Sequence, residues 1–324
     1  MSLLPVCRPH QIQAQDPSTR WLIESLWCTQ AVGIIGGEPK CGKSLLALEL
    51  AVAVATAKPC LRHFATTTQG SVLLYNGEDS PQIIRNRLEG IAGASAVSLE
   101  SLRIGVITAN SLLLDRPEHQ EHLDATVARY RPVLLVLDPF VRLHSGVDEN
   151  AAADVSPILA YLRRLSRQHQ LAITLVHHAR KQSTTRARLG QSLRGSSEFH
   201  AWGDSNLYLQ RKGERLLLSV EHRAAPAIER LRLRFDKISD TACALALDQT
   251  DATDCQPTPQ AHAAATDTIV GVLATAIRPL SIRDLQKSCH MRTQRLCEAL
   301  DTLLKAGSVS RHNDGYRLAS YDNP

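Results

Sequence analysis

Two kinds of segment are missing from this sequence, and their absence narrows the class of protein. The most apolar window, residues 45–57, is interrupted by Glu49 and is too short to cross a bilayer. The first ten residues contain Pro5 and Arg8 and lack the long apolar stretch of a signal peptide. We therefore expect a soluble, cytoplasmic protein that has no membrane partner.

Cysteine pairs with metal-ligand spacing are also missing. The eight cysteines are scattered and none belongs to a C-x-x-C pair, so we expect free thiols in a reducing compartment and no zinc site. Aromatic residues make up only 4% of the chain, but 44% of the residues are hydrophobic, which is enough for a proper core. A length of 324 residues leaves room for one large domain and a small one.

The formal net charge of +5 is modest, but basic residues are concentrated in one part of the chain. Residues 155–197 contain eight Lys or Arg residues and no acidic residue. A stretch of this kind suggests an anionic partner, although it is also compatible with a solvated face.

Residues 37–44 carry the most informative motif. They match the phosphate-binding pattern G-x-x-x-x-G-K-[ST] at every fixed position. An apolar segment at 31–36 predicts a strand before the loop, and the Leu- and Ala-rich segment at 45–57 predicts a helix after it. The free backbone N–H groups and the positive end of the helix dipole would then face the phosphates. The alternative is a chance match in a surface turn.

The motif predicts binding of ATP and Mg²⁺. Lys43 would reach the β- and γ-phosphates, and the Ser44 hydroxyl would hold the metal. The predicted nucleotide-binding residues are Gly37, Glu38, Pro39, Lys40, Cys41, Gly42, Lys43, Ser44 and Leu45.

Strand and helix patterns alternate after the motif. Strands are expected at 71–75, 102–108, 133–137 and 171–176, and helices at 81–91, 118–130 and 154–168, the last with Asp154 as its N-cap. This alternation predicts an α/β fold with a mainly parallel sheet and helices on both sides. Antiparallel strands are expected at 206–210, 215–221, 231–235 and 242–247.

The last part of the chain predicts a separate module. Residues 248–265 are polar and indicate a linker between a large domain at 31–247 and a small domain at 266–321. A lead-in at 1–30 precedes the large domain. Helices at 268–276, 283–288 and 292–306, followed by a hairpin around Asn313-Asp314-Gly315, are typical of a winged helix-turn-helix. Arg292 and Arg295 would then contact duplex DNA, although some winged helices bind proteins instead.

Hydrolysis requires further groups near the phosphate loop. Asp138 directly follows the apolar run at 133–137, as a Walker B aspartate does, although a loop Asp that caps a turn is the alternative. Glu78 follows the strand at 71–75 and is the candidate base, although it could be only a charge at a helix N-terminus. The strand at 171–176 ends in His177-His178, and one of these histidines could contact the γ-phosphate.

Taken together, these motifs resemble RecA-fold ATPases of the plasmid RepA helicase type over roughly residues 20–240. The resemblance rests on residues 37–44, 75–79, 137–144, 148–151, 176–181 and 193–197, which occur in matching order. It implies a RecA-like P-loop domain that assembles into a ring, usually a hexamer, and hydrolyses ATP while holding single-stranded DNA in its central hole.

The resemblance also implies roles for individual residues. It makes Lys43 and Ser44 the phosphate and Mg²⁺ contacts, Asp138 the Walker B acid, Glu78 the water-activating carboxylate and His178, in preference to His177, the γ-phosphate sensor. It places a DNA-binding loop in the ring at the stretch containing Lys181, Arg186, Arg188 and Arg194. The arginine supplied to the adjacent subunit would be Arg223, with Arg194 as the alternative.

Three functions are compatible with these features. The favoured one is a DNA-dependent ATPase, either a helicase-like motor or a helicase loader. The chain departs from plasmid helicases at Lys40 and Cys41, which replace small residues, and in its added C-terminal module. That module favours, as the alternative, a DNA-binding regulator that uses ATP as a switch. A metabolic kinase is poorly supported, because no segment looks like a substrate lid.

Overall fold

The computed structural model describes most of the chain in two compact units, Met1–Asp248 and Gln249–Pro324. The described residues are 4, 6–11, 19–149, 151–178, 197–213, 215–239, 242–248, 259–276, 278–289, 296, 299–300, 302–304, 307–312 and 315–318. None of the helices in these ranges combines the length and the apolar character that a membrane crossing requires.

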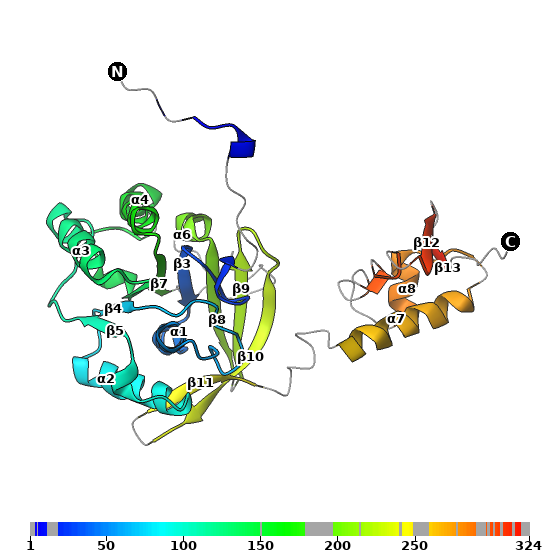
Figure 1. The fold of residues 1–324 in the computed structure, drawn as a ribbon, viewed down its shortest axis with the longest axis horizontal. Helices are drawn as coiled ribbons and strands as arrows, with labels where there is room; N and C mark the ends of the chain where they lie inside the picture. The colour runs from blue at the N-terminus through cyan, green and yellow to red at the C-terminus, as the bar shows by residue number, and fades with distance from the viewer. Residues whose placement is uncertain are drawn as a thin grey trace. The chain divides into compact units, whose positions relative to one another are not determined.

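The first unit is built on a nine-stranded sheet in the order β11-β10-β9-β8-β3-β7-β6-β4-β5 (Figure 1). The six neighbouring strands β5, β4, β6, β7, β3 and β8 run parallel to one another. The neighbours β8, β9, β10 and β11 pair antiparallel. The predicted α/β fold, with a mainly parallel sheet and antiparallel C-terminal strands, is therefore confirmed. The strands are β3 (Val32–Gly37), β4 (Val72–Asn76), β5 (Ile104–Ile107), β6 (Leu134–Asp138), β7 (Ala172–His178), β8 (Ser205–Lys212), β9 (Arg215–His222), β10 (Ile228–Lys237) and β11 (Cys243–Leu247).

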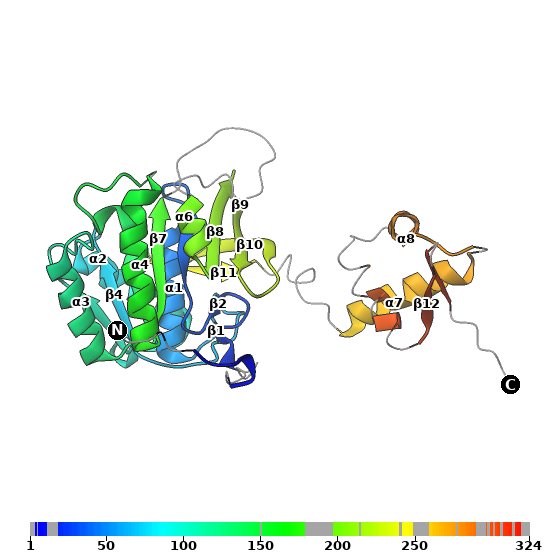
Figure 2. The ribbon, with the colours of Figure 1, turned by 90° about the horizontal axis from the view of Figure 1, so that it is seen from above.

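Helices cover both faces of this sheet, as Figures 1 and 2 show from two directions. One face packs against α1 (Lys43–Thr56) and α2 (Pro81–Ala94), and the other against α3 (Pro117–Tyr130), α4 (Ala152–His169) and the short α6 (Ser197–Trp202). Each face has its own hydrophobic core. Within the described residues, 3₁₀ segments lie at Pro9–Gln11, Leu99–Ser101 and Phe140–Arg142.

The central strands are apolar because both of their faces are covered. All five residues of β6 are buried, and so are the first six of β7. Continuous apolar runs of this kind are expected of parallel strands between two helix layers. Because β3, β4, β6 and β7 run in the same direction, their carboxyl ends meet at one edge of the sheet.

Helix α1 follows the phosphate motif and is buried on every side. Its residues from Leu45 to Ala55 are all buried, which explains why Leu and Ala dominate its sequence. Glu49 is the one acidic residue in this stretch. Its Oε1 accepts hydrogen bonds from Arg62 Nη2 at 3.0 Å and from the backbone N–H of Leu245, in β11, at 2.6 Å. Glu49 therefore joins α1 to the last strand of the sheet.

The residues before β3 form a small two-stranded sheet, β1 (Trp21–Ile23) and β2 (Trp27–Cys28). Leu22, Ile23, Leu26 and Trp27 are buried in the same core as α1. The lead-in is thus packed onto the rest of the first unit through its apolar residues.

The expectation that Asp154 is the N-cap of its helix is wrong. Helix α4 begins at Ala152, its N-cap is Ala151, and Asp154 lies in the first turn. The Asp154 carboxylate accepts the backbone N–H of Asp148 at 3.3 Å, so it binds the preceding loop instead of capping the helix. A carboxylate in the first turn also interacts favourably with the helix dipole.

The second unit has a core of its own. It contains α7 (Pro259–Ala274), α8 (Ile282–Cys289) and a hairpin of β12 (Val309–His312) and β13 (Gly315–Leu318). Residues 296, 299–300 and 302–304 are also helical. Ser281 and Asp284 exchange hydrogen bonds at the start of α8, as in a capping box.

The boundary predicted for the linker needs correction. Helix α7 begins at Pro259, inside the segment 248–265 that the sequence analysis assigns to the linker, and not at residue 268. Proline is favoured at the first position of a helix, and the alanines that follow have high helix propensity. Pro259 therefore starts the helix and does not belong to the linker.

The buried Glu49 generates a prediction about stability. Burial raises the pKa of Glu49 from 4.5 to about 7, against the opposing charge of Arg62. The folded chain then binds a proton more tightly than the unfolded chain, so the free energy of unfolding falls as the pH rises from about 4.5 to 7. We expect Glu49→Gln to reduce this fall by about 3 kcal/mol. Denaturant titrations between pH 5 and 8 would measure it by tryptophan fluorescence.

The control for this experiment is Glu100→Gln, which alters an exposed glutamate in the same unit. All three tryptophans of the chain lie in this unit, so the fluorescence reports its unfolding. An identical pH dependence in wild type and Glu49→Gln would contradict the assignment.

Candidate active site

The phosphate loop occupies the turn between β3 and α1. Gly42 precedes the helix with φ +100°, a conformation that side-chain-bearing residues rarely adopt, which accounts for the second glycine of the motif. The first glycine is required by close packing, because a Cβ on Gly37 would lie 2.4 Å from the carbonyl oxygen of Leu209 in β8. The structure thus explains both fixed glycines.

The remaining loop residues differ in exposure. Pro39 and Lys40 are exposed, Glu38 is half-buried, and Leu45 is buried in the core. The Cys41 thiol is buried and directed toward the Leu209 carbonyl oxygen at 3.8 Å, so it packs against β8. Burial raises its pKa above the usual value, and Cys41 therefore behaves as a packing residue.

Lys43 begins helix α1 and is 3% exposed. Its Nζ donates a hydrogen bond to the Glu38 carbonyl oxygen at 2.7 Å, across the loop. Burial lowers the pKa of Lys43, while the nearby charges of Asp138 and Glu78 act in the opposite direction. The ammonium group is therefore held at the loop with carboxylates close by.

Asp138 ends β6 and is 3% exposed. Burial raises its pKa to about 6, the charges of Asp79 and Glu78 contribute, and a hydrogen bond from the Ser44 hydroxyl opposes the rise. Asn76 Nδ2 donates a second hydrogen bond to Asp138 Oδ2 at 3.2 Å. The structure thus brings together Ser44 and Asp138, the two residues predicted to hold Mg²⁺.

This pair fits a magnesium ion. A hydroxyl and a carboxylate are hard oxygen donors, and a cation beside Asp138 would relieve the repulsion from Asp79 and Glu78 that contributes to its raised pKa. Among the described residues, no group of three or more His, Cys, Asp or Glu side chains is arranged to hold a metal alone. Mg²⁺ usually completes its coordination with water and substrate phosphates, so two protein ligands are sufficient.

Glu78 lies in the loop after β4, and its side chain is exposed. Its Oε1 lies 3.4 Å from Arg142 Nε. Its charge acts on the pKa values of Lys43, Asp138 and His178, so it faces the same space as these residues. This position is compatible with the predicted base.

The two histidines that end β7 point to opposite faces of the sheet, as alternating strand residues do. His177 is buried, its Nε2 lies 3.1 Å from Glu149 Oε2, and its ring centroid lies 4.2 Å from that of Phe199. It is therefore a packing residue on the α4–α6 face.

His178 belongs to the phosphate-loop side. It pairs in register with Gly37 on β3, and burial followed by the charge of Lys43 lowers its pKa. Its Nδ1 is buried and makes no hydrogen bond within the described part of the chain. This placement favours His178 over His177 as the γ-phosphate contact.

Arg223 lies at the opposite edge of the sheet. Its Nε is 3.2 Å from Asp204 Oδ1, and Asp204 precedes β8 and also accepts the backbone N–H of Val32 at the start of β3. Arg223 is therefore a full strand length away from the loop that follows Gly37. It can act only on a nucleotide bound by another copy of the chain.

The predicted DNA contacts are not described by the structure. Four of them lie outside the described residues: Lys181, Arg186, Arg188 and Arg194. Arg194 is also the alternative to Arg223 as the arginine supplied to the adjacent subunit. Arg292 and Arg295 lie outside the described residues as well. Their roles stay predictions.

Two residues that position the site were missed by the sequence analysis. Asn76 Oδ1 accepts the backbone N–H groups of Glu78 at 3.0 Å and Asp79 at 2.7 Å, so one side chain binds both Asp138 and the loop that carries Glu78. The signal was an Asn directly after a strand, which favours such a turn. Arg142, which pairs with Glu78, had no local signal.

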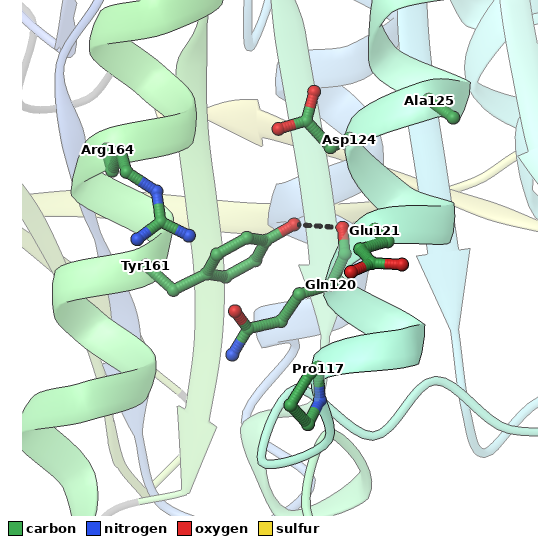
Figure 3. A pocket seen from close by; sticks show the side chains of 7 residues that line it. All are labelled: Pro117, Gln120, Glu121, Asp124, Ala125, Tyr161 and Arg164. Carbon is green, nitrogen blue, oxygen red and sulfur yellow. Dashed lines mark hydrogen bonds between the residues drawn. The ribbon is translucent and has the colours of Figure 1, made fainter.

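The chain also has a cavity of about 440 Å³, but it does not coincide with this site (Figure 3). It lies between α3 and α4 and is lined by Pro117, Gln120, Glu121, Asp124, Ala125, Tyr161 and Arg164. Tyr161 donates its hydroxyl to the Gln120 carbonyl oxygen at 2.8 Å, which joins the two helices. None of the predicted catalytic residues lines this cavity.

Comparisons with known proteins agree with the fold. The model of the AAA domain family matches residues 3–184, more than half of the chain. A segment of 155 residues, 47% of the chain, is 28% identical to the DNA repair protein RadA of Streptococcus pneumoniae and spans only 30% of that protein. A structure of a DnaB-like replicative helicase, described with its interactions with primase, matches with a TM-score of 0.51 and 16% identity over 68% of this chain and 59% of that chain. The predicted RecA-like fold is confirmed.

Asn76 provides the test of this geometry. We expect Asn76→Ala to lower the rate of ATP hydrolysis by about 10- to 100-fold, because the partners that orient metal ligands typically contribute that much. Binding of the nucleotide should change less than the rate, since Lys43 and the loop are untouched. Steady-state hydrolysis and equilibrium binding would separate the two effects.

Asn86→Ala is the matched control, because Asn86 lies on α2 and accepts a hydrogen bond only from Gln82 among the described residues. An unchanged rate in Asn76→Ala, with an intact fold, would contradict the positioning role.

Proposed function

The chain belongs to the AAA domain family, and on that basis we propose that it is an ATPase that works on DNA as an oligomer. In this proposal the first unit binds and hydrolyses ATP with Mg²⁺. It acts as a motor or a loader on single-stranded DNA, in the manner of RepA-type helicases.

One observation carries the proposal: Lys43, Asp138, Glu78 and His178 come from four separate elements and meet at the phosphate loop. Parallel strands place their ends at one edge, and the register pairs Asn76 with Asp138 and Gly37 with His178. Converging groups of this kind are what phosphoryl transfer needs, because its catalysis consists mainly of positioning and charge stabilisation.

Each residue then has a chemical task. Lys43 binds the β- and γ-phosphates, and Ser44 and Asp138 hold Mg²⁺, which neutralises charge that develops on the phosphates. Glu78 accepts the proton of the attacking water, and Arg142, 3.4 Å away, holds that carboxylate in place. His178 has a lowered pKa, so it meets the γ-phosphate as a neutral imidazole that can donate one hydrogen bond.

DNA as the partner rests on the relatives and on charge. The partial relative is a DNA repair protein, and the fold is shared with a DnaB-like replicative helicase. Residues 155–197 contain eight basic and no acidic residues, and we assign the backbone contacts to Lys181, Arg186, Arg188 and Arg194. We assign Arg223 to the site of the adjacent subunit in a ring, which we propose to be a hexamer.

The first test is steady-state ATP hydrolysis by the purified chain without DNA, with single-stranded DNA and with duplex. We expect stimulation by single strands and loss of hydrolysis in Lys43→Ala. Glu78→Gln should lower the rate by about 10²- to 10⁴-fold, the usual contribution of a general base. Glu89→Gln, which alters an exposed glutamate on α2, is the matched control.

Two results would count against the proposal. Equal hydrolysis with and without DNA would argue against the DNA-dependent motor. Full activity in Lys43→Ala would show that hydrolysis does not occur at this loop.

The second unit favours a second candidate function, an ATP-switched regulator that binds duplex DNA. This unit has a core of its own, a capped helix α8 and a hairpin that exposes Arg317. These features are compatible with the predicted winged helix, which would hold a DNA site while the first unit controls assembly.

The regulator is tested with residues 249–324 alone, a piece that includes the whole of α7. We expect this piece to bind a genomic duplex fragment about 10³-fold or more tightly than random duplex, as specific DNA-binding proteins do. Competition binding with both duplexes would measure the ratio. If random duplex competed as well as any genomic fragment, the regulator would be excluded.

A further inference from the structure

An exposed phenylalanine lies at the rim of the phosphate loop. Leu231, Leu233 and Phe235 alternate along β10 and therefore project from the same face of the sheet. Leu231 and Leu233 are 2% and 4% exposed in the core that contains α1, whereas Phe235 is 44% exposed. The row of side chains thus continues beyond the core and ends in an uncovered aromatic ring.

This ring touches the loop itself. A Cβ placed on Gly42, the residue before α1, would lie 3.2 Å from Cζ and 3.5 Å from Cε1 of Phe235. The contact involves the tip of the ring and depends on the absence of a side chain at Gly42. Phe235 is therefore within reach of a molecule whose phosphates occupy the loop.

The ring also lies on the side of the phosphate loop toward which the nucleoside end of a bound nucleotide should point. Apart from Lys43 and Ser44 at the start of α1, the groups assigned to the γ-phosphate and its metal lie at the ends of β4, β6 and β7, on one side of β3 in the sheet. Strand β10 lies on the other side of β3. A nucleotide whose γ-phosphate meets Asp138 and His178 therefore directs its other end toward β10.

Exposed aromatic rings are rare in this chain. Among the Phe, Tyr and Trp side chains of the described residues, only Tyr130 and Phe235 are exposed. Tyr130 lies at the end of α3, in the helix layer on the other face of the sheet. An uncovered ring can stack on a flat apolar partner, and a nucleobase presents such a face.

We propose that the Phe235 ring stacks on the nucleobase of the bound nucleotide and gives the site its preference for purines. The inference rests on the proposed function, since it assigns the base subsite of the same nucleotide. A purine offers a larger stacking face than a pyrimidine, so the ring discriminates by contact area.

The test compares a nucleotide with a probe that lacks the base. We would measure the dissociation constants of ATP, CTP and inorganic tripolyphosphate, each with Mg²⁺, by calorimetry on the full chain. Phe235→Ala lowers the affinity for ATP by about ten-fold, which is the usual scale of base stacking. The same substitution lowers the affinity for CTP less and leaves the affinity for tripolyphosphate unchanged. Phe235→Tyr keeps the ring and restores the affinity for ATP.

Two further variants separate stacking from packing. Phe235→Leu retains an apolar side chain against Gly42 but has no aromatic face. We therefore expect it to lower the affinity for ATP as much as Phe235→Ala does. Tyr130→Ala, which removes the other exposed ring, leaves all three constants unchanged.

The outcomes distinguish the two proposals. Equal weakening of ATP and tripolyphosphate in Phe235→Ala would overturn the inference, because the ring would then support the loop and not the base. Unchanged ATP affinity would overturn it as well. If neither ligand bound the wild-type chain, or if Lys43→Ala had no effect on either, the proposed function itself would fail.

Discussion

Two opposite charges, those of Lys43 and Asp138, are buried at the end of the parallel sheet, and the surrounding structure serves to hold them there. Each is 3% exposed. Buried charges are costly unless hydrogen bonds and opposite charges compensate them. The Glu38 carbonyl oxygen and the Ser44 hydroxyl do so on the loop side, and Asn76 does so from β4. Because α1 is packed on all sides, the ammonium cannot move away from this arrangement without disturbing the core.

Strand alternation then divides the work between the two faces of the sheet. His178 projects on the side of α1 and the nucleotide, whereas His177 projects into the opposite core. There, Glu149 lies between His177 and His144, and although burial alone would raise its pKa, these two histidines lower it. Of these two consecutive residues, His177 thus stabilises the loop at 144–149, and His178 faces the phosphate site. A one-residue change in the register of β7 would exchange these roles and destroy both.

Much of the first unit could be predicted from the sequence, because parallel strands covered on both faces are continuous apolar runs and the phosphate motif is local. The choice between His177 and His178 required the register between β3 and β7, which no local pattern contains. Arg142 pairs with Glu78 although 64 positions separate them in the sequence. The order of the sheet, in which β8 joins β3 and the later strands extend it, depends on tertiary packing alone. The sequence predicts too late a start for α7, because a proline that starts a helix looks the same as one that breaks it.

The antiparallel strands β8 to β11 do more than extend the sheet. At one end they carry Phe235, at the rim of the phosphate loop, and at the other end Arg223 follows β9. Strand β9 has eight residues, so these ends are about 26 Å apart at about 3.3 Å per residue. No movement of a side chain bridges that distance within one copy. If Arg223 completes a catalytic site, that site belongs to a neighbouring copy, and the Asp204 contact that now holds Arg223 must be exchanged when the copies assemble. Hydrolysis would then depend on assembly, because the length of one strand keeps Arg223 away from the phosphate loop of its own copy.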